Sequence, residues 1–190
     1  MFQPVRKKIA MHIGLCRNCQ KCELHQLTVN KSILRGTGWS VKHPYVFVSG
    51  HPDGTEDLIG QPVVGNSGNI LDIAIREVGI KDLECLIVNS VMCTPYTDQS
   101  RLATRNPTKH EVKSCSTNLE RFFTLITPKA VFALGKRAEA ALKLINIPHC
   151  PVAHPDTILK QGGTSSVEYS RFILQLKKEI RNAKAESKVS

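Results

Sequence analysis

The hydrophobic positions along this chain fall into two patterns that alternate. Four short runs are apolar at nearly every position and rich in β-branched or aromatic residues, which is typical of strands buried on both faces of a sheet. These runs are Tyr45–Ser49, Cys85–Asn89, Ala130–Leu134 and residues 150–153. Between and after them, apolar residues recur every three or four positions, and this spacing predicts amphipathic helices.

Several of the predicted helices have clear end signals. Gly79 follows an apolar stripe of helical spacing and is expected to end that helix. Thr108 and Glu111 form a capping box at the start of a second helix, and Pro128 comes after its apolar face. The serine and glutamate of the segment 165–168 predict the start of a last helix.

Strands that alternate with helices predict a parallel sheet covered by helices on both faces. We therefore expect an α/β fold, a three-layer α/β/α sandwich with a central four-stranded parallel sheet. Residues 1–184 are interpreted as one domain, which begins with a basic lead-in over residues 1–18. Residues 185–190 are polar and are interpreted as a flexible tail.

Three loops of unusual composition follow the ends of predicted strands. They are residues 50–57, 89–95 and 154–160. Because ligands bind at the carboxyl ends of the strands in parallel sheets, we expect these loops to meet at one edge of the sheet.

Charge narrows the range of partners. The 190 residues include 26 Lys or Arg and 16 Asp or Glu, a formal net charge of +10. This excess favours a polyanion, with nucleic acid as the first candidate, although a basic surface without a specific partner has the same composition. No apolar run is long enough for a membrane span, and the N-terminus lacks the apolar core of a signal peptide. We therefore expect a protein that is cytoplasmic, or located wherever its nucleic-acid partner lies, and that is neither secreted nor membrane-bound.

Four of the seven cysteines are spaced like soft metal ligands. Cys19 and Cys22 form a close pair, whereas Cys93 and Cys115 are distant single residues. Thiolates in this arrangement hold an iron–sulfur cluster or a zinc ion, and the residues alone leave both open. Cys16 offers a second pair that overlaps the first. The cysteines interpreted as core residues of strands are Cys85 and Cys150.

Motifs at the strand ends and helix starts follow one another in a fixed order. They read Val48-Ser-Gly-His-Pro-Asp-Gly-Thr-Glu-Asp57, Gly60-Gln-Pro-Val-Val-Gly65, Gly68-Asn-Ile-Leu-Asp72, Ile87-Val-Asn-Ser-Val-Met-Cys93-Thr-Pro95, Arg105-Asn-Pro107-Thr-Lys-His-Glu111-Val-Lys-Ser-Cys115, Leu134-Gly135-Lys-Arg-Ala138 and His154-Pro155-Asp-Thr-Ile-Leu159-Lys160. From about residue 19 to residue 160, the chain resembles the family 4 uracil-DNA glycosylases.

The resemblance implies an α/β/α sandwich that removes uracil from DNA after flipping the base out of the duplex. It implies a 4Fe–4S cluster, and the match at Leu24 selects Cys19 and Cys22, with Cys93 and Cys115, as its ligands. Because base excision transfers no electrons, we expect a structural cluster. DNA is the implied partner, replication or repair proteins are candidates for further partners, and the chain by itself is expected to be a monomer.

The resemblance also implies roles for individual residues. His154 is predicted to donate a hydrogen bond to the base as negative charge develops on it, and Asn89 to read the edge of the base. His51 or Asp53 is predicted to orient the attacking water. The predicted base pocket consists of Gly50, Pro52, Val63 and Asn89. The predicted DNA contacts are Gly65, Asn66, Ser67, Arg101, Arg105 and Lys160.

Three positions depart from the motifs of the family. Gly50 stands where the family has a Glu implicated in water activation, Val63 where it has a Phe that stacks on uracil, and Asp53 where it has a Gly. One hypothesis is an active glycosylase for uracil or another altered base, with a wider pocket. A second is a catalytically silenced scaffold that acts as a DNA-binding or replication-accessory module. A zinc-bound nucleic-acid-binding domain outside the family fits only the charge and the cysteines.

Overall fold

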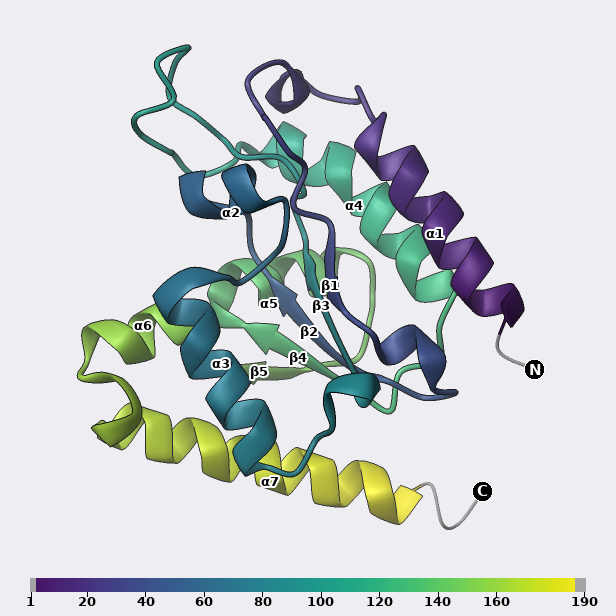
Figure 1. Ribbon diagram of the computed structural model, residues 1–190, viewed down its shortest axis with the longest axis vertical. Helices are drawn as coiled ribbons and strands as arrows, with labels where there is room; N and C mark the ends of the chain where they lie inside the picture. Colours follow the sequence, from purple (N-terminus) through teal and green to yellow (C-terminus); the bar gives the residue numbers. More distant parts are fainter. Residues whose placement is uncertain (1–2, 187–190) are drawn as a thin grey trace.

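One mixed sheet organises the structure, a computed structural model that describes residues 3–186 (Figure 1). The strands are β1 (Leu34–Gly36), β2 (Tyr45–Ser49), β3 (Cys85–Asn89), β4 (Ala130–Leu134) and β5 (Cys150–Val152). Their order is β1-β3-β2-β4-β5. The strands from β2 to β5 pair in parallel, and β1 pairs with β3 in the antiparallel direction. The four predicted strands are confirmed, and β1 adds an edge strand that was not predicted.

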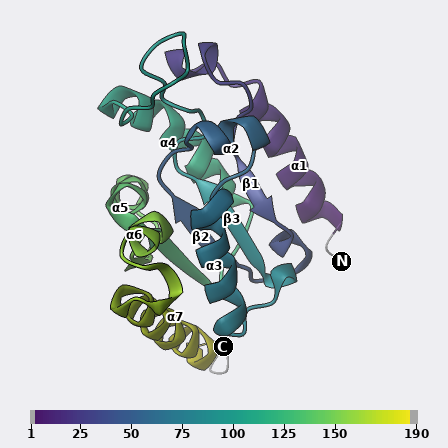
Figure 2. The same ribbon diagram turned by 60° about the vertical axis from the view of Figure 1, so that its left-hand side comes forward.

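Helices cover both faces of this sheet. They are α1 (Gln3–Arg17), α2 (Gly54–Ile59), α3 (Gly65–Glu77), α4 (Lys109–Thr124), α5 (Gly135–Leu144), α6 (Pro155–Lys160) and α7 (Val167–Glu186), with short 3₁₀ helices at Glu23–Gln26, Gly38–Ser40, Asp82–Glu84 and Gly163–Ser165. Helices α3, α6 and α7 pack on one face, and α4 and α5 on the other, where α1 lies against α4 (Figures 1 and 2). The three-layer α/β/α fold is therefore confirmed.

Each face of the sheet has its own core because side chains alternate along a strand. On one face, the rings of Phe47 and Phe132 stack with centroids 4.8 Å apart, and Leu71 of α3 and Phe172 of α7 are buried against them. On the other face, Leu119 of α4 is fully buried among valines of β2 and β3. Burial from both sides explains why the central strands are continuous apolar runs.

Some boundaries differ from the prediction. The basic lead-in over residues 1–18 contains a helix that was not predicted, because its residues 3–17 form α1, with Ile9 buried. The cap of α7 is Ser166, the second serine of the predicted segment, whose Oγ accepts a hydrogen bond from the Tyr169 N–H at 3.1 Å. The predicted tail, residues 185–190, begins inside α7, and residues 187–190 lie outside the described residues.

The predicted end signals of two helices are confirmed. Gly79 follows α3 with a φ of 76°, a left-handed conformation that glycine adopts without strain. At the start of α4, Thr108 Oγ1 accepts from the Glu111 N–H at 3.2 Å, and Glu111 Oε2 accepts from the Thr108 N–H at 2.6 Å. This reciprocal pair is the predicted capping box.

Gly68 in α3 lies close to the backbone of Val63, which belongs to the turn before this helix. A Cβ at Gly68 would overlap the carbonyl oxygen of Val63 and lie 2.9 Å from its carbonyl carbon. Because both are backbone atoms, no side chain can rotate to make room. We predict that Gly68→Ala lowers the free energy of unfolding by about 1–3 kcal/mol, measured by urea denaturation. Gly14→Ala in α1 is the control, since no atom lies within 4 Å of a Cβ there, and equal losses in the two variants would contradict the prediction.

Candidate active site and cysteine pocket

The ends of the parallel strands bring the three predicted loops together. The carbonyl oxygen of Gly50 accepts hydrogen bonds from Ser90 Oγ at 2.7 Å and from the Val91 N–H at 2.9 Å, which join the loops after β2 and β3. The loop after β5 reaches the same place, because His154 Nε2 lies 3.2 Å from Ser49 Oγ. The predicted convergence of the loops is therefore confirmed.

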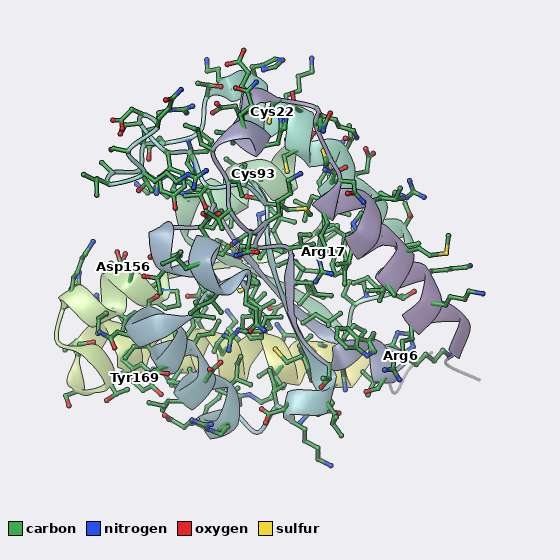
Figure 3. All side chains as sticks on the ribbon, turned by 45° about the horizontal axis from the view of Figure 1, so that its top comes forward. Arg6, Arg17, Cys22, Cys93, Asp156 and Tyr169 are labelled. Carbon is green, nitrogen blue, oxygen red and sulfur yellow. The ribbon has the colours of Figure 1, made fainter. Side chains whose placement is uncertain are left out.

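A cleft opens at this edge of the sheet, between the start of α5, the start of α6 and the loop before α2. Most of the residues that line this cleft are polar or charged. One of them, Asp156, is labelled in Figure 3. The lining residues that bear on the chemistry are Ser49, Gly50, His51, Asp53, Glu56, Ser67, Lys136, Arg137, His154, Asp156 and Lys160.

Two hydrogen bonds fix the ring and the tautomer of His154. Its Nδ1 accepts from the Asp156 N–H at 3.1 Å and so caps α6, which leaves the proton of the neutral ring on Nε2. That Nε2–H points to Ser49 Oγ at 3.2 Å. Burial is the main cause that lowers the pKa of His154, and Arg137 lowers it further. His154 is therefore a neutral hydrogen-bond donor in the cleft.

In His51 the hydrogen-bonding roles of the two ring nitrogens are reversed. Its Nδ1–H donates to the Pro52 carbonyl oxygen at 3.2 Å, so Nε2 carries a lone pair. This Nε2 is buried and has no hydrogen-bond partner among the described residues. Burial lowers the pKa of the ring, which keeps it neutral. The cleft thus holds one imidazole that donates and one that can accept.

The carboxylates of Asp53 and Glu56, which follow His51 in the sequence, accept hydrogen bonds from backbone N–H groups. Asp53 Oδ1 accepts from the Glu56 N–H at 2.9 Å, and Glu56 Oε2 accepts from the Asp53 N–H at 3.1 Å, a capping box at the start of α2. Glu56 Oε1 also accepts from the Val63 N–H. Burial, with a smaller contribution from Asp53, raises the pKa of Glu56 to about 7. Both side chains hold the turn that shapes the floor of the cleft.

A second pocket is lined by five cysteines. They are Cys16, Cys19, Cys22, Cys93 and Cys115, and Lys21 and Lys31 also line the pocket. Cys22 and Cys93 lie at one end of the molecule, away from Asp156 (Figure 3). The remaining cysteines lie elsewhere, because Cys85 is buried in the core of the sheet and Cys150 is half-buried in β5.

Four of these thiols are close enough to influence one another. Burial raises the pKa of Cys115 to about 12, and Cys93, Cys19 and Cys22 raise it further. The pKa of Cys93 rises to about 11 through burial, again with Cys22 and Cys19 contributing. Burial, with a smaller contribution from Cys19, raises the pKa of Cys16 to about 11. The pocket therefore holds the four predicted ligands, Cys19, Cys22, Cys93 and Cys115, with Cys16 beside them.

Neighbouring side chains hold the first pair of cysteines. Asn118 Nδ2 of α4 donates to Cys19 Sγ at 3.4 Å, and Lys21 Nζ donates to Thr117 Oγ1 at 2.6 Å. Cys16 Sγ lies 3.5 Å from Nε2 of the buried His12. Among the described residues, no three His, Cys, Asp or Glu side chains lie close enough to hold a single metal ion.

The sequence matches the profile described as the uracil DNA glycosylase superfamily over residues 39–178. The chain belongs to this superfamily. It is 33% identical over 121 residues to a type-4 uracil-DNA glycosylase of Archaeoglobus fulgidus (64% of this chain, 56% of the relative). It is 31% identical over 128 residues to that of Pyrobaculum aerophilum (67% and 61%), and 33% identical over 122 residues to that of Thermotoga maritima (64% and 59%). The chain thus spans little more than half the length of the curated relatives it matches.

Three residues predicted to line the base pocket of this superfamily member lie outside the cleft. Asn89 is fully buried, and its Nδ2 donates to Ser32 Oγ at 3.0 Å while Oδ1 has no partner among the described residues. Val63 packs in the core beside α3 with a φ of 52°. Pro52 is buried. A role for Asn89 in reading a base stays a prediction, and it requires the contact with Ser32 to open.

Two of the six predicted DNA contacts line the cleft. Ser67 and Lys160 line the cleft, and Lys160 pairs with Asp156 at 2.7 Å. Arg101 lies in an exposed loop with a φ of 56°. Arg105 forms a bidentate pair with Glu111. Two further residues predicted to contact DNA lie at the start of α3, namely Gly65 and Asn66.

Sequence reasoning missed several residues of the cleft, among them Ser49, Lys136, Arg137 and Asp156. Ser49, Lys136 and Arg137 all follow or end a parallel strand, so their positions alone are the signal that predicts them.

In the described part of the chain, no helix has the length and apolar content needed to cross a membrane.

The neutral state of His154 predicts a loss of stability in acid. Its pKa is lowered from an ordinary value of about 6.5, so below that pH the unfolded chain binds a proton that the folded state disfavours. The stability present above this pH is therefore lost as the pH falls. We predict that the unfolding free energy declines by about 1 kcal/mol more in the parent than in His154→Asn between about pH 7.5 and 5.5. Asn keeps the helix cap without titrating, and equal declines in urea unfolding would contradict the prediction.

Proposed function

We propose that this chain is a DNA glycosylase that hydrolyses the N-glycosidic bond of uracil or another altered base. The observation that carries the proposal is the pair of neutral imidazoles in one cleft at the strand ends, with His154 as donor and His51 as acceptor. The type-4 uracil-DNA glycosylases that it resembles support the same reaction class.

His154 supplies the donor for the leaving base. When the bond between the sugar and the base breaks, the electron pair stays on the base, which becomes an anion. The Nε2–H of His154 now faces Ser49 Oγ at 3.2 Å and can turn its hydrogen bond to a base oxygen. A neutral ring suits this task because it keeps its proton and stabilises the anion through the hydrogen bond.

His51 supplies the acceptor for water. Its unpartnered Nε2 can accept a hydrogen bond from a water molecule and orient the oxygen toward the sugar carbon C1′. The water oxygen then bonds to C1′, its proton passes through His51 to the departing base, and the products are an abasic site and the free base. Asp53 was an equal candidate from the sequence, but its carboxylate caps α2. We therefore assign water orientation to His51.

The net charge of the chain, +10, supports DNA as the substrate. The cleft itself has both signs of charge, since Asp53, Glu56, Glu139, Asp156 and Glu168 line it together with Lys136, Arg137 and Lys160. We propose that Lys136 and Lys160 bind the phosphates on either side of an extruded nucleotide. We propose that Arg101 extends this contact, that the chain acts as a monomer beside its DNA in the cytoplasm, and that further partners would be replication or repair proteins.

We also propose that Cys19, Cys22, Cys93 and Cys115 hold a 4Fe–4S cluster. In such a cluster each thiolate binds a different iron, so the sulfurs are farther apart than around one zinc ion. The described residues fit a cluster, since all four thiols line one pocket although they come from three separate parts of the chain. When bound, the cluster supplies cross-links rather than electrons, because glycosidic hydrolysis is not a redox reaction. These links would tie the segment after α1 to α4.

Glycosylase activity is the direct test. Purified holoprotein is incubated with single- and double-stranded oligonucleotides that contain uracil, and abasic sites are cleaved with alkali. We expect cleavage that falls by about 100-fold or more in His154→Asn and in His51→Phe, since each removes one catalytic hydrogen bond. His43→Gln is the matched control, because His43 bonds Thr127 at the opposite end of the sheet. If the parent cleaves nothing but binds DNA in a salt-dependent way, the silenced scaffold is the correct reading.

The ligand assignment predicts which cysteines are needed for iron. We expect the purified protein to be brown, and Cys19→Ser or Cys115→Ser to lose the visible absorbance and the bound iron. Cys150→Ser should keep both, because Cys150 lies in β5 outside the pocket. Cys16→Ser should also keep both, because the resemblance selects Cys19 and Cys22 as the ligand pair, although Cys16 lines the same pocket. Iron analysis and absorbance spectra measure the outcome, and a colourless Cys150→Ser variant would overturn the assignment.

A further inference from the structure

The end of β2 has no side chain at Gly50, and another residue occupies the space that one would fill. A Cβ at Gly50 would lie 3.1 Å from Cβ and 3.5 Å from Cδ of Arg137. Arg137 comes from the first turn of α5, directly after β4. The backbone of Gly50 is held in place, since its carbonyl oxygen accepts from Ser90 Oγ at 2.7 Å and from the Val91 N–H at 2.9 Å.

The guanidinium of Arg137 continues past Gly50 to the segment before α4. Its Nη2 donates to Asn106 Oδ1. Asn106 is itself held, because its carbonyl oxygen accepts from Arg105 Nη1 at 3.1 Å. Arg105 is fixed in turn by Glu111, at 2.7 and 2.8 Å. Arg137 therefore connects the start of α5 to the start of α4 across the end of β2.

Both imidazoles of the cleft lie in the field of this cation. Burial is the main cause that lowers the pKa of His51 and of His154, and Arg137 lowers both further. The other charged groups that act on these rings are Asp53 on His51, and Asp156, Lys160 and His51 on His154.

We propose that Arg137 is the positioning residue of this cleft: its aliphatic stem covers the end of β2 in place of a side chain at Gly50, and its guanidinium fixes the rim through Asn106 and disfavours a second cation on His51 or His154. This inference rests on the proposed function. It also gives a physical reason for glycine at position 50, since a longer side chain there competes with Arg137 for the same space. Positions 50 and 137 are therefore expected to be coupled.

A double-mutant cycle tests the shared space without using activity. Gly50→Ala, Arg137→Ala and the double variant are compared with the parent by urea unfolding. We expect Gly50→Ala to lower the unfolding midpoint in the parent and to lower it much less when Arg137 is already alanine. Additive effects of the two substitutions would overturn the claim that Arg137 fills this space.

Arg137→Met tests the charge, because methionine keeps an unbranched stem without the guanidinium. The control is Lys143→Met, which removes a cation from the far end of the same helix. In an NMR titration, we expect the pKa of His51 and of His154 to rise in Arg137→Met and to stay at the parent values in Lys143→Met. Unchanged imidazole titrations in Arg137→Met would overturn the electrostatic part of the proposal.

Kinetics then connect Arg137 to the reaction. We expect kcat/KM of Arg137→Met to fall by about tenfold, mostly through kcat, because a small misplacement of the cleft groups is costly. The acidic limb of the pH profile should move to higher pH, since the imidazoles would protonate more readily. A fall in kcat/KM that comes only from KM, with an unmoved pH profile, would overturn the positioning role. If the parent has no activity, the proposed function fails, while the unfolding cycle and the titration still decide the role of Arg137.

Discussion

Two hydrogen bonds to the carbonyl oxygen of Gly50 join the cleft to the cysteine pocket. Ser90 Oγ and the Val91 N–H both donate to it, so the pairing of β2 with β3 continues beyond the last residues of the strands. From this junction the chain runs directly to His51 on one side and to Cys93 on the other. A shift of the cysteine pocket would therefore reach the cleft through only a few residues of backbone. This contact gives a physical reason why the proposed cluster could support the cleft without taking part in the proposed reaction.

The polar groups around the cleft differ in how well they are satisfied. The carboxylates of Asp53 and Glu56 accept hydrogen bonds from backbone N–H groups, and these bonds fix the turn that contains Val63. His154 is held at both ring nitrogens. His51 Nε2 is buried with no partner in the described part of the chain, and buried polar atoms of this kind are uncommon in folded proteins. The cleft is thus rigid around one acceptor that is left available for a ligand.

The strands could be predicted from the sequence because burial on both faces produces continuous apolar runs. The edge strand β1 could not, since its three residues are half-buried and follow no alternation. Helix α1 was missed although Ile9 and Cys16 recur at helical spacing, because the lysines beside Ile9 dominate the composition of the segment. His154 and His51 followed from motifs at strand ends. The contact of Arg137 with Gly50 could not be predicted, because it joins two elements distant in sequence through the direction of one side chain.

The cysteine pocket draws on three separate stretches of the chain. Cys19 and Cys22 follow α1, Cys93 follows β3, and Cys115 lies inside α4. During synthesis on the ribosome Cys115 emerges after β1, β2 and β3 but before β4 and β5. The proposed cluster could therefore close only once residue 115 has been made, and until then the early pair of thiols is exposed to oxidants and to competing metal ions.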